Sequence, residues 1–171
     1  MQGAREEKSR SVRFVREEFR RPSNTADAPK NVQRKRSNYQ ATFICRTRNQ
    51  YMTKTKQGRF FEIIASQFLQ LHQVRIIKQN VRTPHGEIDL IGCFKKVLCF
   101  IEVRSKKTPV EFNWQLIVSH VKLQRILSAI EHINHELSDK NMYIDYRLDL
   151  VFICTSKQTI SWIQGILQNN H

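Results

Sequence analysis

Acidic residues are scarce in this sequence of 171 residues. Its 15 Asp and Glu residues stand against 29 Lys and Arg residues, which gives a net charge of +14 at pH 7. This imbalance favours a polyanionic partner, with nucleic acid ahead of a membrane surface. The excess is concentrated in residues 1–57, whose net charge is +10, whereas residues 58–171 have only +4. A basic tail that merely improves solubility is therefore the alternative interpretation.

Long apolar runs and paired cysteines are also missing. No stretch approaches the roughly 18 apolar residues that a membrane span needs, so no membrane partner is expected. Residues 1–21 lack the apolar centre of a signal peptide, and their Glu pairs argue against a transit peptide. The four cysteines form no CxxC pair, which argues against a thiolate metal site and a disulfide framework. Reduced thiols and a cytoplasmic location fit this composition best.

The first third of the chain differs in character from the rest. Residues 1–56 are rich in Arg, Lys, Ser, Asn and Gln and show no apolar period, so we predict a disordered basic extension. From Met52 the chain reads MTKTKQGRFFE and passes directly into a structured pattern. We interpret Met52 as the natural start and residues 1–51 as an upstream extension or a start-site misassignment. Residues 57–171 are then one α/β domain.

The remaining sequence alternates between helical and strand patterns. Apolar positions at helical spacing predict helices over 58–72 and 120–137, with Ser119 as an N-cap. The predicted strands are 74–79, 87–91, 97–104, 146–154 and 160–163. The strand at 97–104 is apolar on both faces through Ile101, which is typical of a central strand covered on both sides. The order α-β-β-β-α-β-β predicts an α/β sandwich, a mixed central sheet flanked by helices.

Three carboxylates interrupt this apolar pattern within one predicted hairpin, at Glu87, Asp89 and Glu102. A four-residue loop at 93–96 would place Glu87 opposite Glu102, with Asp89 as a diagonal neighbour roughly 7 Å from Glu102 at the backbone. Glu62, on the first helix, lies at the edge of its apolar stripe and can reach whatever that helix packs on. Buried acids are costly without a partner. The pattern therefore predicts either a shared cation or a charged network at this hairpin.

The residue types favour a particular cation. Hard oxygen ligands without nearby Cys or His favour Mg²⁺ or Mn²⁺ over zinc. The rival explanation is a structural ion network in which Arg104 and nearby lysines neutralise the acids.

At these residues the chain resembles the YraN family, which is related to Holliday-junction resolvases within the PD-(D/E)xK nuclease superfamily. The resemblance covers about residues 57–167. In chain order it rests on Gly58 and Glu62, Asn80 and Arg82, GEIDLI at 86–91, FIEVR at 100–104, Val118, Ser119 and Lys122, Arg147, Asp149 and Val151, and ISWI at 160–163. GEIDLI followed by EVR at this spacing is a specific signal. The resemblance implies a restriction-endonuclease-like fold.

The resemblance also implies roles for single residues. Asp89 and Glu102 would bind a metal ion, with Glu62 contacting it through water and the Val103 carbonyl as a further ligand. Arg104 occupies the position of the superfamily's catalytic lysine. The implied catalytic residues are Glu62, Asp89, Glu102, Arg104 and Lys122. The candidate nucleic-acid contacts are Arg82, His85, Lys106, Lys107 and Lys122, with a merely exposed turn histidine as the alternative for His85.

The implied function is a metal-dependent endonuclease that hydrolyses DNA phosphodiesters, with branched DNA in repair or recombination as the expected substrate. Resolving a junction requires two coordinated sites, so a homodimer is expected. Arg104 stays protonated at any relevant pH and cannot act as a general base. A non-catalytic nucleic-acid-binding protein on the same fold is therefore the alternative. A structural domain whose acids are neutralised by Arg104 and Lys122 is the third hypothesis.

Overall fold

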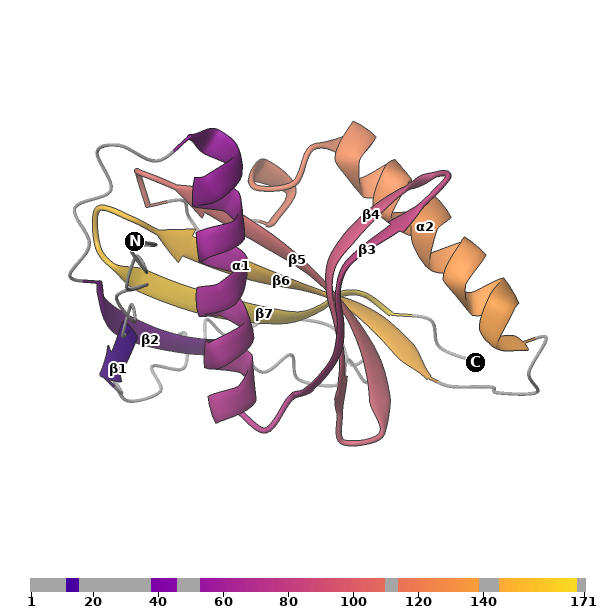
Figure 1. Ribbon diagram of the computed structural model, residues 1–171, viewed down its shortest axis with the longest axis horizontal. Helices are drawn as coiled ribbons and strands as arrows, with labels where there is room; N and C mark the ends of the chain where they lie inside the picture. Colours follow the sequence, from indigo (N-terminus) through magenta and orange to yellow (C-terminus); the bar gives the residue numbers. More distant parts are fainter. Residues whose placement is uncertain (1–11, 16–37, 46–52, 110–113, 139–144, 169–171) are drawn as a thin grey trace, which may run out of the picture.

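A mixed sheet between two helices forms the framework of the computed structural model, which describes residues 12–15, 38–45, 53–109, 114–138 and 145–168 (Figure 1). Its elements are β1 (Val12–Val15), β2 (Asn38–Cys45), α1 (Lys54–Leu71), β3 (Arg75–Thr83), β4 (Gly86–Phe94), β5 (Val97–Lys106), a 3₁₀ turn (Trp114–Leu116), α2 (His120–Ser138), β6 (Tyr146–Cys154) and β7 (Thr159–Gln168). The strand order is β1-β2-β7-β6-β5-β4-β3, and only β5 and β6 run parallel. The predicted order of helices and strands from the first helix onward is confirmed, and the arrangement fits a nuclease-like sandwich.

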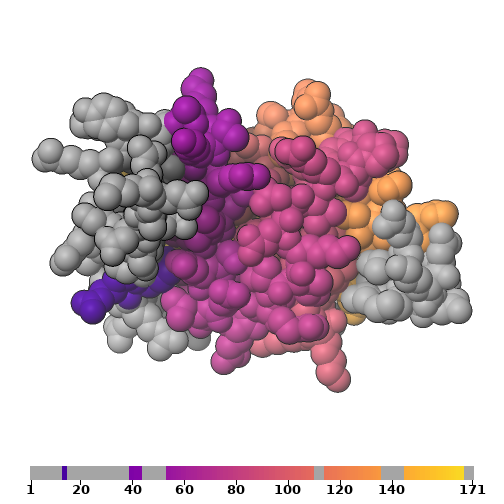
Figure 2. All heavy atoms as spheres, in the orientation of Figure 1, coloured from indigo at the N-terminus to yellow at the C-terminus, as the bar shows by residue number. Residues whose placement is uncertain are grey.

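Helix α1 covers one face of the sheet. Thr53 caps its first turn by accepting a hydrogen bond from the Lys56 amide at 3.4 Å. The apolar stripe that predicts this helix is buried, and Phe68 and Leu69 are fully inaccessible to solvent. They pack against inward-facing residues of β5, β6 and β7. In Figure 2, α1 and the strands that follow it in the chain form the front surface of the molecule.

Helix α2 covers the opposite face and builds a second core. Ser119 caps it by accepting from the Lys122 amide at 3.3 Å, which confirms the predicted N-cap. Ile126 and Ile130 pack on the alternate residues of β5 and β6, among them Phe100 and Leu150. The sheet thus has an apolar layer on each side, because successive side chains of a strand point to opposite faces. Neither helix in the described part of the chain has the length and apolarity needed to cross a membrane.

The expectation of a structureless N-terminal extension is wrong for part of its length. Strand β2 pairs with β7 and extends the sheet beyond it, and Phe43 and Ala41 are buried in the α1-side core. Tyr39 stacks on Trp162 with ring centroids 5.0 Å apart. The apolar letters of NYQATFIC alternate with polar ones, which is a strand period that the basic composition around it concealed. Whether Met52 is the natural start stays a prediction.

Candidate functional site

The hairpin that carries the acids closes more tightly than predicted. Phe94 pairs with Val97, so the turn consists of two residues, Lys95 and Lys96, with φ angles of 50° and 68°. Two consecutive left-handed residues are the geometry of a type I′ turn, which usually uses Asn-Gly rather than two lysines. The four-residue loop at 93–96 is therefore wrong, because the sequence lacks the usual turn signal.

The tighter turn changes which acids face each other. Pairing runs from Phe94 and Val97 to Leu90 and Ile101, and the next step of this register brings Asp89 across from Glu102. The expected placement of Glu87 opposite Glu102 is wrong by this two-residue shift. The two predicted metal-binding acids lie close together, since the charge of Asp89 raises the pKa of Glu102.

Asp89 lies where β4 departs from β5. The main-chain pairing of β4 with β5 ends at Leu90. At the next residue, the Asp89 carboxylate replaces that pairing by accepting a hydrogen bond from the Val103 amide at 2.8 Å. Ile88 belongs to the α2-side core, whereas Leu90 belongs to the α1-side core. Since residues two apart on a regular strand share a face, β4 must rotate at Asp89. Figure 1 shows the result, a fork in which the β3–β4 hairpin turns away from β5 toward α2.

Of the three acids at this fork, Glu87, Asp89 and Glu102, Glu102 is the most buried. Only 2% of its side chain is exposed. Arg104 Nη2 lies 2.6 Å from Glu102 Oε1 and Lys122 Nζ lies 3.5 Å from the same oxygen. Neither carboxylate oxygen has a well-aligned hydrogen-bond donor among the described residues, although the Lys122 contact still lowers the pKa of Glu102. Burial, reinforced by the charge of Asp89 and only partly opposed by Arg104 and Lys122, raises the pKa of Glu102 to about 8.

Lys122 links the second helix to the fork. Its ammonium lies 3.7 Å from Glu87 Oε1 as well as 3.5 Å from Glu102, so it bridges two of the three hairpin acids. Glu87 is 58% exposed and stands at the outer side of the site. Burial raises the pKa of Asp89, whereas the Val103 amide and the charge of Lys122 oppose that rise. The predicted position of Lys122 beside the acids is thus present in the fold.

Glu62 approaches the fork from α1, on the other side of the sheet. Burial raises its pKa, and the negative charge of Asp89 adds to the rise. A hydrogen bond from the Asn80 side chain acts in the opposite direction. Asn80 has a φ of 54°, a left-handed conformation that Asn tolerates better than most residues. The sequence marked Asn80 as part of a motif, but only the fold reveals that it orients Glu62.

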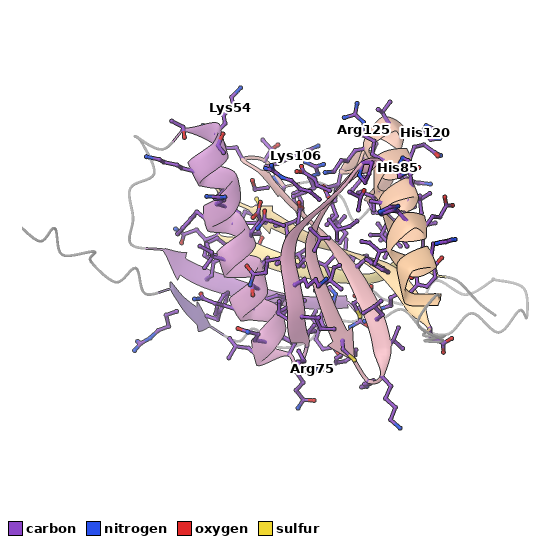
Figure 3. The ribbon with its side chains drawn as sticks, turned by 45° about the vertical axis from the view of Figure 1, so that its right-hand side comes forward. Lys54, Arg75, His85, Lys106, His120 and Arg125 are labelled. Atoms are coloured by element: carbon purple, nitrogen blue, oxygen red, sulfur yellow. The ribbon has the colours of Figure 1, made fainter. Side chains whose placement is uncertain are left out.

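Apart from Lys122, which joins the fork, the predicted nucleic-acid contacts surround it. Arg82 is exposed on the edge strand β3 and lies across from Glu87. His85 is exposed in the β3–β4 turn, where its ring contacts that of His132 on α2. Lys106 and Lys107 are exposed at the end of β5. Figure 3 shows Lys54, Lys106, His85, His120 and Arg125 at one end of the molecule and Arg75 at the other.

Gly86, the first residue of GEIDLI, has a packing role that the motif does not state. A Cβ atom at this position would lie 2.7 Å from the Arg125 carbonyl oxygen on α2. A side chain there would therefore push the β3–β4 hairpin off α2 and displace Glu87 from Lys122.

The donor set suits a hard divalent cation, although it is incomplete by itself. Among the described residues, no three His, Cys, Asp or Glu side chains form a ready-made metal cluster. Mg²⁺, however, is commonly held by one or two carboxylates and completed by water and substrate phosphates. Asp89 and Glu102 supply two carboxylates, and Glu102 Oε2 has no hydrogen-bond donor among the described residues, unlike most buried polar atoms. These residues fit such a cation.

Comparison with known proteins matches residues 61–153 to the model of "Uncharacterised protein family UPF0102", the YraN family. Among curated relatives, a UPF0102 protein of Dichelobacter nodosus is 32% identical over 124 residues, which cover 70% of this chain and 94% of the relative. One from Marinobacter nauticus is 35% identical over 118 residues, covering 66% and 93% respectively. UPF0102 protein VP0448 of Vibrio parahaemolyticus is 30% identical over 115 residues, covering 67% and 94%. The matched region contains the whole acidic fork.

Proposed function

From the premise that this chain belongs to the UPF0102 (YraN) family, we propose that it is a metal-dependent endonuclease that hydrolyses phosphodiesters in DNA. The single observation that carries the proposal is the state of Glu102. It is a buried carboxylate without an aligned hydrogen-bond donor, placed across from a second acid at a fork in the sheet. A purely structural acid is normally satisfied, whereas a strongly perturbed one in a polar site is a candidate for function.

Asp89 and Glu102 would hold the cation, which we propose is Mg²⁺ or Mn²⁺. A divalent cation bound there supplies Lewis acidity toward a phosphoryl oxygen and toward water. The Val103 amide fixes the Asp89 carboxylate through one oxygen and thereby orients it. Glu62, held by Asn80, provides a third acid at the edge of the site and can accept a proton from water.

Arg104 and Lys122 supply positive charge for the phosphate. Both contact Glu102 in the described structure. Once a divalent cation neutralises Glu102, their charge becomes available to the substrate and its developing negative charge. Arg104 acts only as an electrostatic partner, since its guanidinium does not give up a proton.

The surroundings of the fork favour nucleic acid as the substrate. Basic residues stand on both sides of it, with Lys54 and Lys106 near α1 and Arg125 near the start of α2 (Figure 3). Such flanking charge attracts the phosphate backbone of a nucleic acid. We propose branched DNA as the preferred form and a homodimer as the active state, because resolving a junction needs two cuts.

A second candidate function has its own supporting observation. Arg104, in place of a lysine, forms the shortest ion pair of the site, 2.6 Å from Glu102. An arrangement in which Arg104 permanently neutralises Glu102 would bind nucleic acid without cutting it. The two functions differ in one measurable outcome, cleavage that depends on a divalent cation.

The deciding experiment incubates the intact protein with branched, nicked and single-stranded DNA, with and without Mg²⁺ or Mn²⁺. We expect cation-dependent cleavage that falls by about 100-fold or more in Asp89→Asn and in Glu102→Gln, because each removes a proposed cation ligand. Glu131→Gln is the matched control, since Glu131 is an exposed acid on α2. Cation-independent cleavage, or full activity of Asp89→Asn, would refute the nuclease. Salt-sensitive binding without cleavage would establish the second function.

A further inference from the structure

A pocket separate from the acids lies where three elements meet. Its volume is about 410 Å³. The lining residues come from the start of α1, the end of β5 and the turn between β6 and β7, namely Gln57, Ser105, Lys106, Lys107, Thr155 and Ser156. Ser105 directly follows Arg104 on β5, so the pocket continues from the fork along the same strand.

Main-chain hydrogen bonds hold two walls of this pocket together. The Thr155 amide donates to the Lys106 carbonyl at 2.9 Å, and the Ser156 amide donates to the Lys107 carbonyl at 3.2 Å. The Cys154 thiol adds a weaker contact to the Lys107 carbonyl at 3.6 Å. The end of β5 and the β6–β7 turn are therefore one fixed unit, and the pocket is a built feature of the fold.

The chemistry of the pocket suits an anion. Its lining has two lysines, three hydroxyl groups and one amide, and none of the six lining residues is acidic. The first turn of α1, beside the pocket, also has no acid, and it carries exposed lysines at Lys54 and Lys56. A helix N-terminus favours negative charge, so cations there slightly destabilise α1. A bound anion would offset this cost.

The position of the pocket identifies the anion. Glu102 and Lys106 are four residues apart on β5, about 13 Å along an extended strand. Successive nucleotides of one DNA strand rise by about 3.4 Å. A DNA strand with one phosphate at the fork would therefore bring a phosphate a few nucleotides away to the pocket.

We propose that the pocket between the start of α1, the end of β5 and the β6–β7 turn binds a backbone phosphate of the DNA strand that crosses the acidic fork. This inference rests on the proposed function and adds a second fixed contact to it. Lys106 and Lys107 provide the charge, with the Lys106 ammonium also donating to the Leu116 carbonyl at 3.1 Å. The hydroxyls of Ser105 and Ser156 provide hydrogen bonds, whereas the Thr155 hydroxyl already donates to the Lys106 carbonyl. Two fixed points define the direction of the strand across the site, which one cluster of acids does not.

The test measures binding of a short fluorescent DNA duplex in EDTA over a range of salt concentrations, so that cleavage plays no part. The variant is the full chain with Lys106→Gln and Lys107→Gln. We expect several-fold weaker binding and a salt dependence whose log–log slope falls by about 1, the value for one lost phosphate contact. Ser156→Ala should weaken binding about twofold or more at an unchanged slope, because it removes a hydroxyl and no charge.

The matched control is Lys95→Gln with Lys96→Gln, an exposed lysine pair in the β4–β5 turn. It changes the net charge equally and retains the same N-terminal segment. If both double variants lose the same affinity and slope, the pocket is refuted while DNA binding and the proposed function stand. If the wild-type protein binds no DNA in EDTA at any salt concentration, the pocket is refuted, while cation-dependent cleavage remains the separate test of the proposed function.

Discussion

Two buried carboxylates on neighbouring strands, Asp149 and Glu102, differ in how well their oxygens are hydrogen-bonded. Asp149 on β6 pairs with Ile101 on β5, and the next position along brings Glu102 beside Leu150. Asp149 accepts hydrogen bonds from Arg147 Nε at 2.8 Å, from Trp162 Nε1 at 2.9 Å and from the Gly165 amide at 2.8 Å. Glu102, on the other face of the sheet, has only unaligned contacts with two cations.

The difference separates a hydrogen-bonded structural acid from the acid that we propose binds a cation. Both acids are almost fully buried, so burial alone does not distinguish them. Asp149 has three aligned donors, and both of its oxygens are satisfied within the fold, whereas Nη2 of its partner Arg147 has no hydrogen-bond partner among the described residues. Glu102 retains unsatisfied oxygens, and an unsatisfied buried acid costs free energy unless a ligand completes it. Stability experiments can therefore test the comparison directly.

The largest expected effect on stability comes from replacing Asp149. Asp149→Asn keeps the shape but removes the charge opposite Arg147 and one or more of the three accepted hydrogen bonds. We expect the free energy of unfolding in urea to fall by about 3–5 kcal/mol, the cost of leaving a buried charge without its partner. Asp145→Asn, an exposed acid just before β6, is the control and should change it by less than about 0.5 kcal/mol. A loss below about 1 kcal/mol would show that Asp149 is not the structural acid described above.

In the absence of divalent cations, Glu102→Gln should change the free energy of unfolding in the opposite direction to Asp149→Asn, that is, it should stabilise the protein. The folded state raises the pKa of Glu102 from 4.5 to about 8, so the folded protein binds more protons than the unfolded chain within that range. The free energy of unfolding therefore falls as pH rises from about 4.5 to about 8, by at most about 1.4 kcal/mol per pH unit for this group. Gln cannot ionise, so the variant should flatten this part of the pH profile and be the more stable protein at its upper end. Urea unfolding of both proteins between about pH 4.5 and pH 8 measures the slope of the pH profile and the stability at its upper end. Identical profiles for the wild type and Glu102→Gln would contradict the raised pKa of Glu102.

Added Mg²⁺ should stabilise the wild-type protein through the same fork. At ten times the dissociation constant, a cation that binds only the folded state adds about 1.4 kcal/mol. The gain should be larger at pH 8 than at pH 6, because protons compete with the cation for Glu102. Thermal unfolding with and without Mg²⁺ measures it. Glu131→Gln should keep the gain and Asp89→Asn should lose it, whereas an equal gain in both would place the cation elsewhere.

The smallest expected effect on stability belongs to Arg104→Lys. The Arg104 side chain is 37% exposed, so we expect a change within about 0.5 kcal/mol. Cleavage should rise several-fold, because a lysine ammonium can exchange a proton whereas the guanidinium cannot. Cleavage rates of the wild type and of Arg104→Lys, measured across pH, test whether the lysine raises activity. A large drop would indicate that the planar guanidinium itself is needed at this position.

Local patterns predicted much of what the fold contains. The boundaries of β6 and the N-cap at Ser119 both match the structure, because each depends on residues close together in the chain. Strand β2 was missed because its alternation stands inside a strongly basic segment. The hairpin register was missed because Lys95 and Lys96 adopt left-handed conformations, which a pair of lysines does not predict.

By itself, the sequence determined that acids stand inside apolar strands, that Glu62 lies at the edge of a helical stripe, and that a basic chain carries them. These facts follow from residue type and local periodicity. Only the tertiary structure decided which acid is satisfied and which is not. Asp149 and Glu102 look alike in sequence, but the donors around Asp149 include Trp162 and Gly165 from another strand, while β4 rotates at Asp89 and opens the fork beside Glu102. Contacts between distant segments, and the end of the β4–β5 ladder at Leu90, decide where the proposed cation site lies.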